Sequence, residues 1–197
     1  QDDLSKNVAA MRELKSGFLL VYLPTKTPKL KNYEAEIQRF AENFAHVDHI
    51  KHLRDDTIGE LLALQNGLIN GFKNDYTFSE VIMTYDTLNS FFYDKNMVLK
   101  QNFSLEDKDY LVFNNRKVIH EDNILKDAFV VSDKEGNVLN SPFPSEIPIR
   151  FKRLALLKLG KKDLSNLSYE EMEIYDKKYS WKNFDKNPSI ALVKFLN

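Results

Sequence analysis

Three of the four histidines of this 197-residue chain lie close together, and their side chains could hold a metal ion. His46, His49 and His52 are spaced three residues apart, and Asp48 lies among them. Zinc, nickel and copper accept imidazole ligands beside a carboxylate. If one helix runs through this stretch, the histidines lie away from its apolar stripe, and a solvated polar face is the alternative interpretation. The sequence does not show whether the fourth histidine, His120, approaches the other three.

The composition excludes several other kinds of chemistry. The chain contains no cysteine, so disulfides, thiol nucleophiles, CxxC redox pairs and iron–sulfur clusters are not available to it. No glutamate follows His46 or His49 directly, as a HExxH zinc site requires, and phosphate-binding loops, dinucleotide fingerprints and GxSxG elbows are absent. The sequence therefore predicts no cofactor, and it favours a non-enzymatic protein without excluding an enzyme.

Three consecutive aromatic residues, Phe91, Phe92 and Tyr93, form a candidate binding surface. Successive residues of a strand point to opposite faces, so three neighbouring rings cannot all enter one core. Aromatic side chains are more often buried than exposed, and a core position is the alternative for each of them. We expect at least one ring to be partly exposed and available to a partner.

A second candidate binding surface is the run of residues 150–162, which contains Arg150, Lys152 and Arg153 and no acidic residue. Such a run could attract a polyanion, a phosphate or an anionic lipid surface, or it could be the solvated face of an ordinary strand or helix. The whole chain has 28 Lys and Arg against 29 Asp and Glu. This near balance gives no field that would attract nucleic acid, and we expect no nucleic-acid partner.

The elements that must position these residues include a central strand at residues 17–24, a continuous apolar run between a glycine and a proline. Such a run is typical of a strand that is buried on both faces. Residues 78–85 and the shorter segment 110–113 are rich in strand-forming residues. Residues 128–139 have the pattern of a hairpin, with Asp133 opening the turn and Gly136 closing it.

Two long helices are expected between the first two strands. Apolar residues recur at steps of three and four over residues 30–47, which predicts one amphipathic helix. Thr57 and Glu60 have the spacing of a capping box and predict the start of a second helix. With the connection placed at residues 53–56, the two helices would form an antiparallel hairpin over about residues 29–74.

These elements predict a single α/β domain over residues 1–197, with a central mixed sheet flanked by helices and a helical-hairpin insertion. A short amphipathic helix is expected at residues 3–14, and residues 149–197 are expected to be mostly helical. The sequence shows no transmembrane segment.

The order of strand, helices, strand and terminal hairpin resembles the thioredoxin-type layout. Where that family has its CxxC motif, this chain has Pro-Thr-Lys-Thr-Pro at residues 24–28, and where it has a cis-proline, this chain has Lys126 and Asp127. The resemblance implies that residues 17–24 form a central strand parallel to residues 78–85. It implies no redox activity, and a thioredoxin-like module retained for binding is one possible function.

The segments GFLLVYLPTK, FSEVIMTYD, FFYDKN and NSPFP resemble a group of exported bacterial proteins of unknown function. The resemblance implies secretion or a periplasmic location, as does the start at Gln1 without an initiator methionine. We interpret the chain as a non-enzymatic module that binds a protein or a small ligand through residues 91–93 or 150–162. The alternative is a metal-dependent or acid–base hydrolase that uses the three clustered histidines.

Overall fold

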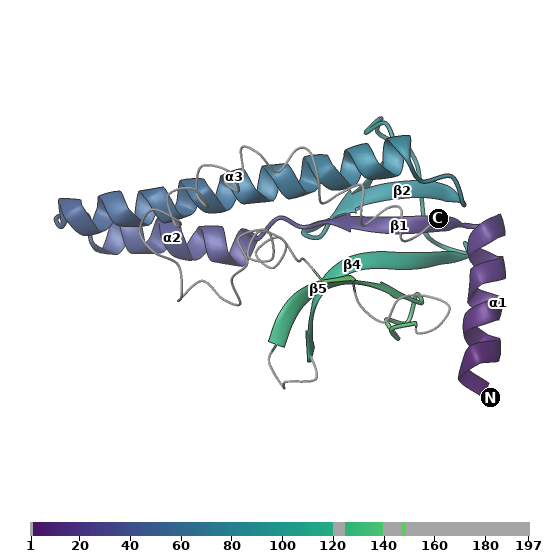
Figure 1. Ribbon diagram of the computed structural model, residues 1–197. Helices are drawn as coiled ribbons and strands as arrows, with labels where there is room; N and C mark the ends of the chain where they lie inside the picture. Colours follow the sequence, from purple (N-terminus) through teal and green to yellow (C-terminus); the bar gives the residue numbers. More distant parts are fainter. Residues whose placement is uncertain (1, 120–124, 140–146, 149–197) are drawn as a thin grey trace.

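A computed structural model describes residues 2–119, 125–139 and 147–148 of the chain. Several residues named above lie outside this part: His120, the basic run with Arg150, Lys152 and Arg153, and the C-terminal segment 149–197 that is expected to be mostly helical. The described part begins with helix α1 (Asp2–Ser16) and contains two further helices and the strands of one sheet (Figure 1).

The sheet is mixed and has the strand order β3-β2-β1-β4-β5-β6. Its strands are β1 (Phe18–Leu23), β2 (Glu80–Tyr85), β3 (Leu88–Asp94), β4 (Tyr110–Ile119), β5 (Leu125–Ser132) and β6 (Ile147–Pro148). Strand β1 runs parallel to β2 and β4, whereas the outer pairs β2–β3, β4–β5 and β5–β6 are antiparallel. The predicted α/β class with a central mixed sheet is confirmed.

Strand β1 lies in the middle of the sheet because every one of its residues is apolar or aromatic. Leu19 and Leu20 point to opposite faces, and both are almost completely buried. Each β1 residue from Phe18 to Val21 pairs with both neighbouring strands, as a central strand must. The parallel pairing of β1 with β2 agrees with the thioredoxin-type layout, which otherwise stays a prediction.

The first face of the sheet carries the larger hydrophobic core, which α1 and the C-terminal half of α3 cover. Phe113 of β4 lies at its centre and is fully buried. Its ring stacks on Phe129 at 4.9 Å between centroids and meets the edge of Phe72 from α3 at 5.5 Å. Offset and edge-to-face pairs of this kind stabilise a core beyond the apolar area that they bury.

Gly17 is the residue that lets β1 begin directly after α1. A Cβ atom at this position would lie 2.3 Å from the backbone oxygen of Asp109, just before β4. Only glycine allows two backbones to approach so closely. The position therefore fixes the junction between α1, β1 and β4.

Between β1 and β2 the chain forms a helical hairpin of α2 (Thr27–Arg39) and α3 (Phe44–Asn74), which projects beyond the end of the sheet (Figure 1). We call α2 and residues 40–60 the helical arm, and residues 40–47 its tip. The arm is held along a narrow seam, in which Glu34 of α2 pairs with Arg54 of α3 at 3.0 Å. Helix α2 has no buried residue.

The predicted boundaries inside this hairpin are wrong. The helix expected over residues 30–47 ends at Arg39, because the side chain of Asn43 accepts a hydrogen bond from the backbone of His46 at 3.2 Å and caps a new helix. Residues 53–56, expected to connect the helices, lie inside α3. Thr57 is therefore not a cap: it is buried in mid-helix, and its hydroxyl is the main influence that lowers the pKa of the Tyr33 phenol.

The second face of the sheet has a smaller apolar cluster of Phe18, Leu20, Ile82, Phe92 and Val112. Residues from the segment between β3 and β4, among them Phe103 and Leu105, pack against it. This segment and the outer strand β3 contribute residues to the sheet edge and to the pocket that are described below. No helix of the described residues has the length and apolar composition needed to cross a membrane.

Candidate functional site

The structure places the three clustered histidines in different surroundings at the start of α3. The ring of His46 packs edge to face with Phe40 at 4.7 Å, and its buried Nε2 atom has no hydrogen-bond partner among the described residues. His49 is exposed, and His52 lies 3.6 Å from Asp48 on the open surface of the helix. Among the residues that the structure describes, no group of three or more His, Cys, Asp or Glu side chains is arranged to hold a metal.

The three consecutive aromatic residues of β3 also differ from one another. Phe92 is buried on the second face, where its ring lies 5.1 Å from that of Phe103. Tyr93 is partly buried on the first face, against Tyr85. Phe91 is the exposed member of the three.

Phe91 belongs to a group of exposed apolar side chains along the β3 edge of the sheet. The exposed fractions are 49% for Leu88, 47% for Phe91, 61% for Val98 and 45% for Leu99. We call these four residues the rim. Single exposed apolar residues are ordinary, whereas an exposed sheet edge that carries apolar residues is a candidate interaction surface.

A bulge in β3 shapes the rim. Met83 pairs with Tyr93 and Tyr85 with Leu88, so residues 89–92 of β3 lie opposite the single residue Thr84 of β2. The Thr84 hydroxyl is fully buried, 3.0 Å from the Leu88 carbonyl and 2.9 Å from the Phe91 carbonyl. It donates its one proton to either oxygen and so holds the bulge against the sheet.

The outer side of β3 is covered in part by the segment that follows it. The backbone of Asp94 donates to the carbonyl of Val98 at 2.9 Å, and Lys100 donates to the carbonyl of Phe92 at 2.8 Å. These two bonds flank Leu99, whose own N–H and C=O therefore point away from β3. Neither group of Leu99 has a partner in the part of the chain that the structure describes.

The carboxylate of Asp94 holds the turn that leads into this segment. Its Oδ1 atom accepts hydrogen bonds from the backbone N–H groups of Val98 at 2.9 Å and Asn96 at 2.8 Å. The bond from Val98 is the main cause that lowers the pKa of Asp94, with a further contribution from Asn96. An ionised Asp94 thus fixes the position of the rim residues Val98 and Leu99.

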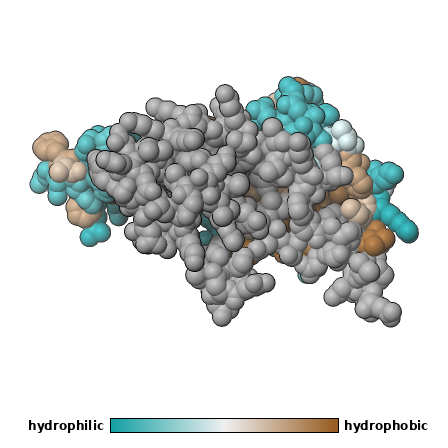
Figure 2. All heavy atoms as spheres, viewed as in Figure 1, coloured by the Kyte–Doolittle hydropathy of each residue, from teal (hydrophilic) through white to brown (hydrophobic). Residues whose placement is uncertain are grey.

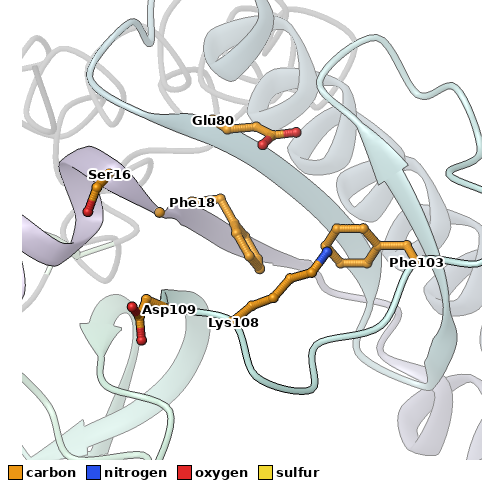
Figure 3. A pocket seen from close by; sticks show the side chains of 7 residues that line it. Ser16, Phe18, Glu80, Phe103, Lys108 and Asp109 are labelled. Carbon is orange, nitrogen blue, oxygen red and sulfur yellow. The ribbon is translucent and has the colours of Figure 1, made fainter.

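A shallow, open pocket of about 260 Å³ lies at the amino ends of the parallel strands (Figure 3). Its lining comprises Ser16, Gly17, Phe18, Glu80, Phe103, Lys108 and Asp109. The rings of Phe18 and Phe103 meet at 5.7 Å and form its aromatic part. The Lys108 ammonium lies 3.9 Å from the centre of the Phe103 ring, and Figure 3 shows the Asp109 carboxylate directed away from it.

The polar groups of this pocket do not form a catalytic arrangement. Glu80 is paired with Lys100, and the Ser16 hydroxyl donates to the carbonyl of Glu13 at 3.1 Å. The described residues therefore place no base beside the one hydroxyl of the lining. The pocket is an open surface feature. It is connected to strand β3 through Phe92, whose carbonyl accepts a hydrogen bond from the Lys100 N–H and whose ring contacts Phe103.

Leu88, Val98 and Leu99 are the rim residues that sequence reasoning missed. One signal was present: Asp94, Lys95 and Asn96 form a polar turn between two short apolar segments. This turn is typical of a chain that doubles back on itself, but the sequence does not reveal that the returning segment ends as the outermost one of the sheet.

No protein-family model matches the chain, and comparison with curated proteins and with solved structures gives no match.

Proposed function

We propose that the protein is a non-enzymatic binding module that takes up a short extended segment of a partner protein along the rim. The observation that carries this proposal is the pair of unpartnered backbone groups of Leu99 among exposed apolar side chains. A sheet edge with free N–H and C=O groups is a template for an added strand.

The apolar side chains define the chemistry of the segment. Leu88, Phe91, Val98 and Leu99 are exposed apolar residues of this part of the chain, and those that lie beside the added strand would be covered by apolar side chains of the partner. An aromatic residue at the centre of such a patch is the usual source of binding energy in an interface. The partner segment is therefore extended and apolar at alternate positions.

The edge is short, and this limits the affinity. Met97 and Asn102 have φ angles of 62° and 57°, so the extended backbone between them covers only a few residues. Two backbone hydrogen bonds contribute about 1 kcal/mol each, and the small apolar area adds a few kcal/mol more. We expect a transient complex, with a Kd on the order of micromolar or weaker.

The test uses a short designed peptide that alternates valine with threonine, followed by amide chemical shifts in NMR. The peptide is expected to shift the amides of residues 98–100 in a saturable way. Leu99→Pro removes the outward N–H and is expected to abolish the shifts, whereas Leu99→Ala keeps the N–H and is expected to weaken binding only severalfold. Saturable shifts confined to the arm tip, or none at millimolar peptide, would overturn the proposal.

A second variant separates binding from folding. Phe91→Ser changes an exposed side chain, so the near-UV circular dichroism spectrum is expected to stay unchanged while peptide affinity falls about tenfold. Lys51→Ser on the exposed surface of α3 serves as the matched control and is expected to leave the affinity unchanged.

We also propose that this module is exported, to the periplasm or beyond. The resemblance of the segments GFLLVYLPTK, FSEVIMTYD, FFYDKN and NSPFP to exported bacterial proteins supports this location. Fractionation of the native host, with the protein detected by antibody, tests it. Recovery with the cytosolic markers would contradict it.

A further inference from the structure

Among the described residues, the N–H and the C=O of Leu99 both lack a partner, and this makes the edge complementary to itself at this position. In an antiparallel pair, two residues that lie directly opposite can exchange both hydrogen bonds, N–H to C=O in each direction. Leu99 of one copy has the donor and the acceptor that Leu99 of another copy needs.

We propose that two copies of this chain pair antiparallel through residues 98–100, about a twofold axis at Leu99. The pairing rests on the proposed function in one respect, because it uses the same edge: a dimer closes the rim, and a partner segment must displace the second copy. Such a contact is isologous, with the same patch contributed by both copies.

The length of the edge favours a second copy over a longer strand. The positive φ angles of Met97 and Asn102 turn the chain away from the extended path on both sides of Leu99. A long strand would find no backbone partner beyond this point. A second copy presents an edge of the same short length, with its turns at the same distance from the axis.

The side chains around the axis are compatible with this contact. Val98 and Leu99 are exposed and apolar, and each would meet apolar residues of the other copy. Lys100 would lie opposite Val98 of the other copy, but its ammonium is already paired with Glu80 and lies 5.4 Å from the centre of the Phe103 ring. Neither copy therefore brings an uncompensated charge to the axis.

Two other surfaces of the described residues fit a second copy less well. The arm tip lies at the left end of Figure 2. It contains Phe44, which is 83% exposed, but from Phe44 onward its backbone is helical and offers no extended edge for strand pairing. Strand β6 at the opposite side of the sheet is described for two residues only, and Pro148 has no N–H to donate.

Sedimentation velocity of the full chain, from about 1 μM to about 1 mM, tests the pairing. The wild-type protein is expected to show a reversible monomer–dimer equilibrium. Leu99→Pro is expected to weaken dimerisation at least tenfold and Leu99→Ala less, while Phe44→Ser leaves it unchanged. A monomer at every concentration, or a dimer that Phe44→Ser removes and Leu99→Pro does not, would overturn the proposal.

The valine–threonine peptide distinguishes this inference from the proposed function. Binding of the peptide by a protein that stays monomeric overturns the pairing and leaves the binding function intact. A Leu99-dependent dimer that no peptide dissociates supports the pairing and removes the binding function. Dissociation of the dimer by the peptide supports both.

Discussion

The sheet and the helical arm both contain regularly placed apolar residues, but they bury them to different extents. Leu20 and Val21 in the central strand expose no surface, whereas α2 has no buried residue at all. Both faces of the sheet are covered by packing, whereas among the described residues α2 packs against α3 without burying any residue of its own. An apolar stripe therefore shows which side of an element is covered, but not how completely.

The difference extends to what each region can offer a partner. The arm exposes Phe44 at its tip, on a helix whose backbone groups are mostly satisfied internally. The rim exposes apolar side chains together with free backbone groups at Leu99. Direction and register come from hydrogen bonds, so under the proposed function the rim would specify a partner more closely than the tip would.

The largest expected difference between the two regions is in the free energy of unfolding after truncation of one aromatic residue in each. Phe113→Ala removes a fully buried ring that contacts Phe72 and Phe129, and it is expected to destabilise the protein by about 3–5 kcal/mol. Phe44→Ala removes an exposed ring and is expected to change stability by less than about 0.5 kcal/mol. Urea unfolding followed by circular dichroism measures both, and equal losses would break the comparison.

Removal of either of two buried hydroxyl groups of the sheet is expected to change the free energy of unfolding by a smaller amount. Thr84→Val removes the donor that holds the β3 bulge and is expected to cost about 1–3 kcal/mol, because a carbonyl of the bulge loses its partner. Ser132 is equally buried, but within the described part of the chain its hydroxyl has no hydrogen-bond partner, so Ser132→Ala is expected to be neutral or slightly stabilising. A loss of stability only in Ser132→Ala would show that the bulge does not depend on Thr84.

The smallest expected effect is the loss of stabilisation of the turn before the rim at low pH. The pKa of Asp94 lies below the ordinary value of 3.8 because its carboxylate accepts backbone hydrogen bonds. A depressed pKa means that this stabilisation is complete above the unfolded-state pKa and is lost as pH falls through the folded-state value. An NMR titration is expected to give a midpoint below 3.8, with the amides of Asn96 and Val98 changing in parallel.

Asp94→Asn is the control for that titration, because it removes the carboxyl group while keeping an acceptor oxygen. The amide changes of Val98 are expected to disappear from the acidic range in this variant. A wild-type midpoint at or above the ordinary value would contradict the assigned role of Asp94.

Local patterns in the sequence are sufficient to predict the central strand and one turn. Residues 18–23 are all apolar or aromatic between Gly17 and Pro24, which leaves little choice but a strand with both faces buried. Gly136 does adopt the left-handed conformation expected of it, with φ 91°. In both places the residues next to each other in the chain determine the structure.

Other features depend on contacts that the sequence does not reveal. The strand expected at residues 110–113 continues as β4 to Ile119, although Asn114 and Asn115 are poor strand formers, because β5 pairs with it along this length. The break at residues 40–43 was missed because Phe40 and Phe44 are four residues apart and keep the helical spacing across the turn. The rim was found only in part, since its exposure depends on which strand ends up at the edge.

One uninterrupted helix connects the two regions of the molecule. Helix α3 extends from Phe44 to Asn74, and its 31 residues span about 46 Å at 1.5 Å per residue. One end carries the exposed tip, and the other carries Phe72, which contacts Phe113 in the core. The helix has no internal break, so the exposed tip and the buried Phe72 ring belong to one continuous element.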